Sequence, residues 1–187
     1  MEHDPAQVYT PADDTFLLLD AARQEARPRD SVLEIGTGSG YIAGELRKAV
    51  RRVVATEINP HAAASAREQG IDVIRTDLFA GVRGTFDLII FNPPYLPTAP
   101  EERIGDWLEY ALDGGISGRE VIARFLSGAG RVLAPGGRIL LLISSLTGLP
   151  NVTGIAFEEK YYAEVVRDQV VEGERLYVIR LKRNGKS

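Results

Sequence analysis

The sequence contains no cysteine, which excludes disulfide bonds, zinc–thiolate sites and thiol nucleophiles. Histidine is scarce as well, with only His3 and His61 present, so little material is available for a metal site. We therefore expect no bound metal. The absence of cysteine also favours a reducing compartment, and we expect a cytoplasmic location.

Long hydrophobic runs and an excess of positive charge are also missing. The longest apolar run, Ile139–Ile143, is far shorter than the roughly 20 residues that cross a bilayer, and Met1–Pro5 lacks the pattern of a signal peptide. The formal net charge is -4, whereas surfaces that bind phosphates carry a concentrated basic stripe. We expect neither a membrane nor a nucleic acid as partner. A small basic cluster near the C-terminus is interpreted as a solvated tail after an edge strand: Arg180, Lys182, Arg183 and Lys186.

The chain otherwise has an ordinary globular composition. It has 187 residues, of which 44% are hydrophobic and 26% are charged. Single hydrophobic cores commonly organise about 100 to 200 residues. We therefore expect one domain over residues 1–187, in which 1–28 form an N-terminal covering segment and helix and 29–187 form the main sheet.

Short β-branched runs alternate with helical segments along most of the chain. The expected strands are 31–35, 52–56, 73–75, 86–91 and 138–144, and the expected helices are 11–24, 41–50, 61–69 and 118–126. This alternation is typical of a parallel sheet with helices on both faces. The sequence therefore predicts a doubly wound α/β fold.

The pattern changes near the C-terminus. Residues 161–171 and 175–182 are extended runs separated only by Glu172, Gly173 and Glu174, which predicts a hairpin. The result is a mostly parallel, seven-stranded sheet that ends in an antiparallel hairpin. Nicotinamide-binding folds continue with parallel units instead. The predicted arrangement is typical of Rossmann-like class I methyltransferases.

A glycine-rich loop, Glu34-Ile35-Gly36-Thr37-Gly38-Ser39-Gly40, follows the first expected strand. Glycines such as Gly36 and Gly38 permit a tight turn and let a ligand approach the backbone. The spacing differs from that of dinucleotide sites, and Glu34 would repel a pyrophosphate but attract a cationic aminoacyl group or a sulfonium. We therefore predict S-adenosyl-L-methionine as the cofactor, with an unliganded turn as the alternative.

Two further acids stand where expected strands end. Glu57 lies about 20 residues beyond the glycine loop, where an acid in Rossmann-type sites binds ribose hydroxyls. Asp77 ends the third strand and is placed to accept a hydrogen bond from an adenine amino group, while Leu78 donates its backbone N–H or covers the ring. The alternatives are a surface glutamate at a strand end and an aspartate that braces a loop.

The tetrapeptide Asn92-Pro93-Pro94-Tyr95 follows the fourth expected strand, at the edge where open α/β sheets bind ligands. The prolines fix the backbone and remove two N–H donors. Acceptor N–H groups would then bind the Asn92 side-chain oxygen and the Pro93 carbonyl, while Tyr95 stacks on a planar group. Catalysis would rest on proximity and electrostatics. We expect Asn92, Pro93 and Tyr95 to act in catalysis.

The acceptor class stays open on these residues. The same tetrapeptide serves adenine N6-methyltransferases of DNA or RNA, although base flipping needs basic recognition surface that is not visible here. Protein lysine and a cofactor-binding protein without catalysis are further alternatives. The long irregular stretch 93–118 contains Ile104, Trp107, Leu108 and Tyr110, which either fold over the acceptor or pack as a short helix.

At this point the sequence resembles a known family, the HemK/PrmC class of glutamine N5-methyltransferases, and especially its short archaeal and eukaryotic branch that modifies class-I translation release factors. The resemblance spans nearly the whole chain. Besides the glycine loop and the tetrapeptide, it rests on Val8–Leu18 and on Leu112–Glu120, which includes Asp113-Gly114-Gly115. The latter run is interpreted as a substrate-side segment or as a plain turn.

The resemblance implies methylation of a glutamine in a Gly-Gly-Gln loop of a release factor. It places Thr15 at the methionine end of the cofactor, together with Asn92, and we expect the acceptor to bind along 92–96, that is Asn92, Pro93, Pro94, Tyr95 and Leu96. Bacterial members carry an additional N-terminal helical domain, whereas this chain begins almost directly at the catalytic fold, which puts the mode of substrate docking in question.

The short branch often pairs with a small zinc-binding activator protein that covers an apolar sheet edge. The third expected strand is such an edge, with Val73, Ile74 and Phe79 near it. The resemblance thus implies such a partner on this edge, and the alternative is that these side chains belong to the core.

Overall fold

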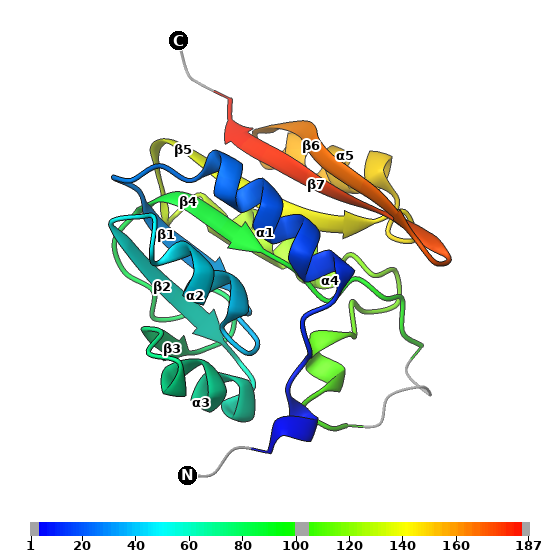
Figure 1. Cartoon of the computed structure of the whole chain (residues 1–187). Helices are drawn as coiled ribbons and strands as arrows, with labels where there is room; N and C mark the ends of the chain where they lie inside the picture. Colours follow the sequence, from blue (N-terminus) through cyan, green and yellow to red (C-terminus); the bar gives the residue numbers. More distant parts are fainter. Residues whose placement is uncertain (1–3, 100–104, 185–187) are drawn as a thin grey trace.

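The computed structural model describes residues 4–99 and 105–184, which form one seven-stranded sheet flanked by helices (Figure 1). The sheet order is β3-β2-β1-β4-β5-β7-β6. The strands are β1 Ser31–Ile35, β2 Arg52–Glu57, β3 Val73–Arg75, β4 Phe86–Phe91, β5 Leu133–Ser144, β6 Tyr161–Val171 and β7 Glu174–Arg183. Strands β1 to β5 are parallel, and β7 runs antiparallel to both β5 and β6. The predicted fold class is confirmed.

Helices cover both faces of the sheet. They are α1 Asp13–Glu25, α2 Tyr41–Leu46, α3 Pro60–Glu68, α4 Glu120–Ala129 and α5 Leu149–Glu158, with short 3₁₀ helices η1 Pro5–Gln7 and η3 Glu109–Ala111. Alternate strand residues point to opposite faces. Val32 and Leu88 therefore join the cluster under α1, α2 and α3, whereas Leu33 and Ile89 join the cluster under α4 and α5.

Three features differ most from the sequence prediction, and the other element boundaries shift by at most three residues. Helix α2 ends at Leu46 rather than at residue 50, because the chain must turn to bring Arg52 beside Ser31. Strand β5 begins at Leu133, and the Pro-Gly-Gly run lies inside it as a bulge between two pairing registers. Helix α5 was not anticipated, since Thr153 and Gly154 weaken its propensity and packing of its buried residues supplies its stability.

The third strand is an edge strand, as predicted, whereas Phe79 belongs to the core. Its ring stacks on Phe125 with a centroid separation of 5.4 Å, and its side chain is buried. Val73 is also buried, and Ile74 is half-buried against the same core. The β3 edge is thus less apolar than the sequence suggests. None of the helices in the described part of the chain is long and apolar enough to cross a membrane.

The basic cluster near the C-terminus is not a tail, so that interpretation was wrong. Arg180, Lys182 and Arg183 lie within β7, which is enclosed between β5 and the true edge strand β6. Lys186 lies outside the described residues. The Arg180 guanidinium forms ion pairs with Glu25 and Glu164.

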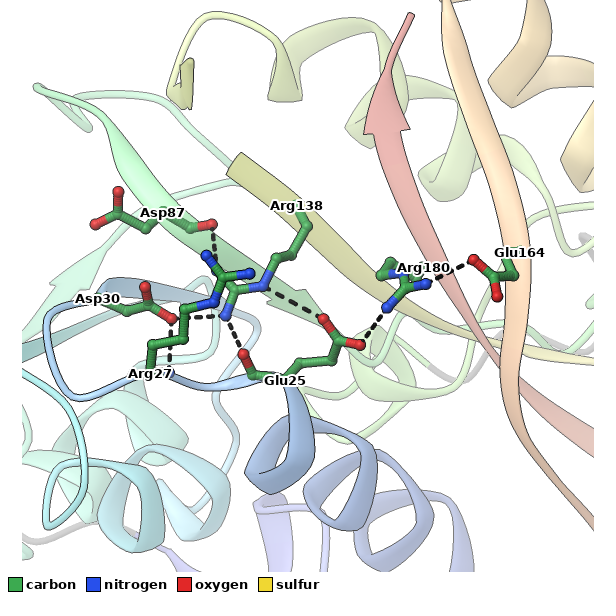
Figure 2. A network of polar contacts seen from close by, with 7 residues as sticks. All are labelled: Glu25, Arg27, Asp30, Asp87, Arg138, Glu164 and Arg180. Atoms are coloured by element: carbon green, nitrogen blue, oxygen red, sulfur yellow. Dashed lines mark hydrogen bonds and ion pairs between the residues drawn. The ribbon is translucent and has the colours of Figure 1, made fainter. Parts of the chain in front are cut away.

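Arg138 is the centre of a polar network at the end of the sheet where β4 begins (Figure 2). Its side chain is only 3% exposed and lies 2.6 Å from the Asp30 carboxylate and 3.4 Å from that of Glu25. The same guanidinium donates to the Asp87 carbonyl at 3.0 Å. Because Glu25 ends α1, the network ties the C-terminal end of this helix to the sheet.

Replacing Arg138 by alanine should destabilise the fold by about 3–5 kcal/mol, because it leaves the buried Asp30 carboxylate without its counter-ion. Urea denaturation at pH 7 measures this loss. Arg23→Ala is the control, since the Arg23–Glu45 pair is solvent-exposed and its loss should change the stability far less than the loss of Arg138. Equal, small losses in both variants would contradict the role given to the network.

Candidate active site

A cavity of about 780 Å³ opens at the carboxyl ends of β1, β2 and β4. Every site residue predicted from the sequence lines it, namely Thr15, Glu34, Gly36, Gly38, Glu57, Asp77, Leu78 and the five residues from Asn92 to Leu96. They come together because the carboxyl ends of parallel strands meet at one edge of a sheet. The volume is in the range of cavities that enclose small-molecule ligands.

The glycine loop has the backbone conformation that its sequence predicts. Gly36 and Gly38 have φ angles of 62° and 57°, in the left-handed region that side chains disfavour. The Gly38 N–H donates to the Glu57 carboxylate at 2.8 Å, which joins the loop to the end of β2. Gly40 also has a positive φ, of 86°, and in addition a Cβ there would lie 2.9 Å from that of Ala66 in α3.

Glu34 is buried between the glycine loop and α2. Its Oε2 accepts hydrogen bonds from the Thr37 hydroxyl at 2.6 Å and from the Ala43 N–H at 3.0 Å. Burial raises the pKa of Glu34 to about 8, although both hydrogen bonds oppose the rise. The carboxyl group is therefore ready to ionise when a cation enters the cavity.

Glu57 and Asp77 carry contacts within the protein that the sequence did not reveal. The second Glu57 oxygen accepts from the Asn59 N–H at 2.9 Å, and burial raises the pKa of Glu57. Asp77 forms an ion pair with Arg124 of α4. Leu78 has a φ of 46°, a conformation that is strained for a branched side chain and that often marks a functional site.

Asn92 is bound to the first helix. Its Nδ2 donates to the Asp14 carboxylate at 2.9 Å, and the Tyr9 hydroxyl donates to the same oxygen at 3.1 Å. Asn92 Oδ1 is buried, and no group among residues 4–99 and 105–184 donates to it. Sequence reasoning missed Asp14, since an acid in the first turn of a helix is adequately explained by the helix dipole.

The tyrosines near Asn92 are held as neutral phenols. Burial and the Asp14 charge raise the pKa values of both Tyr9 and Tyr95 well above their ordinary range. Neither phenol can therefore act as a general base near neutral pH. Tyr95 lies in the cavity wall, where its ring offers a flat apolar surface.

The glycine segment 112–118 braces the backbone of the tetrapeptide. The Gly114 N–H donates to the Leu96 carbonyl at 2.9 Å, and the Thr98 N–H donates to the Gly115 carbonyl at 2.9 Å. A Cβ at Gly114 would lie 3.0 Å from the Pro94 carbonyl oxygen, although the φ of Gly114 is ordinary. Close backbone approach therefore explains this glycine. Asp113 also lines the cavity.

The N-terminal segment and the long loop form a further wall of the cavity, side by side in Figure 1. The Trp107 N–H donates to the Gln7 side chain at 3.0 Å, and the Asn59 side chain donates to the Gln7 carbonyl at 2.6 Å. Trp107 and Tyr110 line the cavity beside the 3₁₀ turn η3. Ile104 lies outside the described residues. Within the described ranges, no group of three or more His, Asp or Glu side chains could hold a metal ion.

Comparison with known proteins identifies the family. Residues 12–104 match the model described as methyltransferase small domain. The putative protein N5-glutamine methyltransferase of Methanocaldococcus jannaschii is 42% identical over 149 residues, which cover 76% of this chain and 75% of that protein. The chain belongs to the protein glutamine N5-methyltransferase family. It is therefore an enzyme, and the resemblance inferred from its motifs is confirmed.

Other methyltransferases and a solved structure agree. Methyltransferase HEMK2 of Homo sapiens is 38% identical over 72% of its length and 73% of this chain. The solved structure is that of the E. cuniculi Mtq2–Trm112 complex, which is described as responsible for methylation of the termination factor eRF1. Its matching chain has a TM-score of 0.79 and is 31% identical. The match covers 95% of this chain and 99% of that chain. The release factor glutamine methyltransferase of Deinococcus radiodurans is 38% identical, but the match covers only 54% of it and 73% of this chain.

Gly114→Ala should lower the methyltransferase rate by about 100-fold, because the added methyl group would lie 2.8 Å from the Gly118 Cα and 3.0 Å from the Pro94–Tyr95 backbone, and would shift that backbone in the cavity wall. Steady-state kinetics with saturating cofactor measure this effect. Gly154→Ala in α5 is the matched control, because its Cβ meets nothing within 4 Å and alanine favours a helix. An unchanged rate in Gly114→Ala would refute the bracing role.

The pKa of Glu34 predicts a pH-dependent stability in the ligand-free glutamine methyltransferase. The folded-state pKa of about 8 lies above the ordinary glutamate value of 4.5, so the contribution to stability is complete below pH 4.5 and is lost as the pH rises to about 8. The loss should amount to about 3–5 kcal/mol. Glu34→Gln should remove this component, which urea denaturation between pH 5 and 8 will measure. Parallel pH profiles for the two proteins would contradict the prediction.

Proposed function

We propose that this enzyme transfers a methyl group from S-adenosyl-L-methionine to the side-chain nitrogen N5 of a glutamine in the Gly-Gly-Gln loop of a class-I translation release factor. The observation that carries the proposal is the buried, unpaired Oδ1 of Asn92 in a residue that lines the cavity. An unpaired buried acceptor is costly, which favours a ligand that supplies an N–H donor.

The acidic side of the cavity supports the proposed cofactor. Glu34 would face a cationic aminoacyl group, and Glu57 would accept from ribose hydroxyls beside Gly36 and Gly38. Both carboxylates are buried, and burial raises the pKa of each. A positively charged ligand would relieve that unfavourable desolvation. Thr15, at the start of α1, would touch the methionine end.

The other end of the proposed cofactor would bind near β3. Asp77 would accept from the adenine amino group while it keeps its ion pair with Arg124. The left-handed backbone of Leu78 supports a role for its N–H or side chain against the ring. When bound, S-adenosyl-L-methionine supplies an electrophilic methyl group.

The acceptor end would act by positioning. An amide nitrogen is a weak nucleophile because its lone pair is delocalised into the carbonyl group. Hydrogen bonds from its two N–H groups to Asn92 Oδ1 and to the Pro93 carbonyl would hold it in line and favour localisation of the lone pair. Pro94 and Leu96 would shape the acceptor channel, and Tyr95 would stack on the amide plane. Electrostatic contacts of this kind need no strong base.

The relatives support the choice of substrate. The E. cuniculi complex is described as responsible for the methylation of eRF1, and the Deinococcus radiodurans relative is a release factor glutamine methyltransferase. The former was solved with Trm112, which supports an activator partner for this enzyme, whereas the zinc in that partner and its place on the β3 edge are implied by the family resemblance alone. A release factor substrate also supports action in the cytoplasm.

We also propose that residues 1–28 act as a cofactor-covering segment of the single domain 1–187. Tyr9 and Thr15 line the cavity, and Gln7 is bonded to the loop at Trp107, which supports this role. Segment and loop together would exclude water from the bound cofactor.

Asn92→Ala should lower methyl transfer to the release factor by at least about 100-fold, while cofactor affinity changes little. Labelled cofactor, a release factor and its Gln→Ala variant in the Gly-Gly-Gln loop provide the assay. Labelling should require both Asn92 and the glutamine.

Equal labelling of the Gln→Ala factor would refute the glutamine assignment. Labelling of duplex DNA or RNA above background would support adenine instead, and labelling of a lysine peptide would support lysine. If the isolated chain is inactive, co-expression with the activator distinguishes a missing partner from a wrong substrate.

A further inference from the structure

We propose that Asp14 is a positioning residue that determines which atom of the Asn92 amide is available to the acceptor. The inference rests on the proposed function, because it assigns a role within the same site. Asp14 lies in the first turn of α1, is 5% exposed, and accepts from Asn92 Nδ2 at 2.9 Å across 78 residues of sequence.

The hydrogen-bonding capacities of the Asp14 carboxylate and the Asn92 amide fix the orientation of that amide. An ionised carboxylate only accepts hydrogen bonds, whereas a side-chain amide has a donor nitrogen and an acceptor oxygen. The opposite rotamer of Asn92 would bring two acceptor oxygens to hydrogen-bond distance. Asp14 therefore selects the rotamer in which Nδ2 is engaged and Oδ1 is left to accept from another N–H.

Asp14 is itself firmly held. The Thr15 hydroxyl donates to its Oδ1 at 3.1 Å, and the Tyr9 hydroxyl donates to its Oδ2 at 3.1 Å. The carboxylate also lies at the N-terminal end of α1, where the helix dipole favours negative charge. These contacts hold the carboxylate in one orientation, so the Asn92 amide receives a fixed partner.

The orientation has a consequence for specificity. With Oδ1 free, Asn92 binds an acceptor that carries an N–H and disfavours an acceptor that presents only lone pairs. If the carboxylate became an amide, Asn92 could pair with it in either rotamer. In the reversed rotamer its NH₂ group would meet the N–H of the acceptor, and the productive complex would be lost.

Asp14→Asn tests the role with little change in shape. We expect kcat to fall by about 10- to 100-fold, as for other groups that orient a functional side chain. The KM for the release factor and the cofactor Kd should change by no more than about threefold, and the Tm should stay within about 4 °C of the native value. Asp13→Asn is the matched control, because Asp13 lies in the same helical turn and is exposed.

A second measurement does not depend on activity. The Asn92 side-chain amide protons, assigned by their absence in Asn92→Ala, should exchange slowly with solvent in the native enzyme and in Asp13→Asn. In Asp14→Asn they should exchange faster, because the charged acceptor that held them is gone.

Unchanged amide exchange in Asp14→Asn, or a kcat like that of Asp13→Asn, would overturn the proposal. If the cofactor affinity and the Tm of Asp14→Asn fall together with its kcat, Asp14 has a structural role instead. If the native enzyme labels a different acceptor, only the proposed substrate is refuted. The kcat values of Asp14→Asn and Asp13→Asn can then be compared with that acceptor. If no acceptor is labelled, amide exchange still decides the role of Asp14.

Discussion

The hydrogen bond from Asn92 to the Asp14 carboxylate joins two parts of the chain on which the proposed acceptor site depends. One partner begins α1, and the other directly follows β4. This hydrogen bond can form only if α1 is held in a fixed position along the sheet. Leu18 and Ala22 pack into the core below the helix, and at its far end Glu25 pairs with the buried Arg138 (Figure 2). The ion network thus supports the site from the opposite end of the sheet.

The concentration of acids around the cavity is the second physical constraint. Asp14, Glu34 and Glu57 are all nearly buried, and burial raises the pKa values of the two glutamates. Clustered buried acids are unfavourable in the empty protein, so a cationic ligand gains affinity by neutralising them. A cationic ligand that binds only the folded protein would therefore also stabilise the fold.

Local patterns predicted the strands best where periodicity and composition agree. The strands 31–35 and 86–91 have the predicted bounds, because a buried parallel strand is a short apolar run that ends at polar residues. The start of β5 and the helix α5 were missed. In both cases glycine and proline weaken the local signal, and pairing with β4 or packing on the core determines the structure. The interpretation of Arg180 as part of a solvated tail failed although the predicted strand 175–182 already contained this residue, and its ion-pair partners Glu25 and Glu164 are remote in sequence.

The sequence by itself determined that the sheet is mostly parallel with a C-terminal antiparallel hairpin, and which candidate residues stand at the strand ends. Parallel strands deliver residues such as Glu34, Glu57 and Asn92 to one edge, so their spacing along the chain is enough to group them. Only the tertiary structure decided how these residues are held. The contact of Asp14 with Asn92 and the close approach of Gly114 to Pro94 depend on distances between segments that local sequence does not encode. Such distances are set by the packing of α1 and the long loop on the finished sheet.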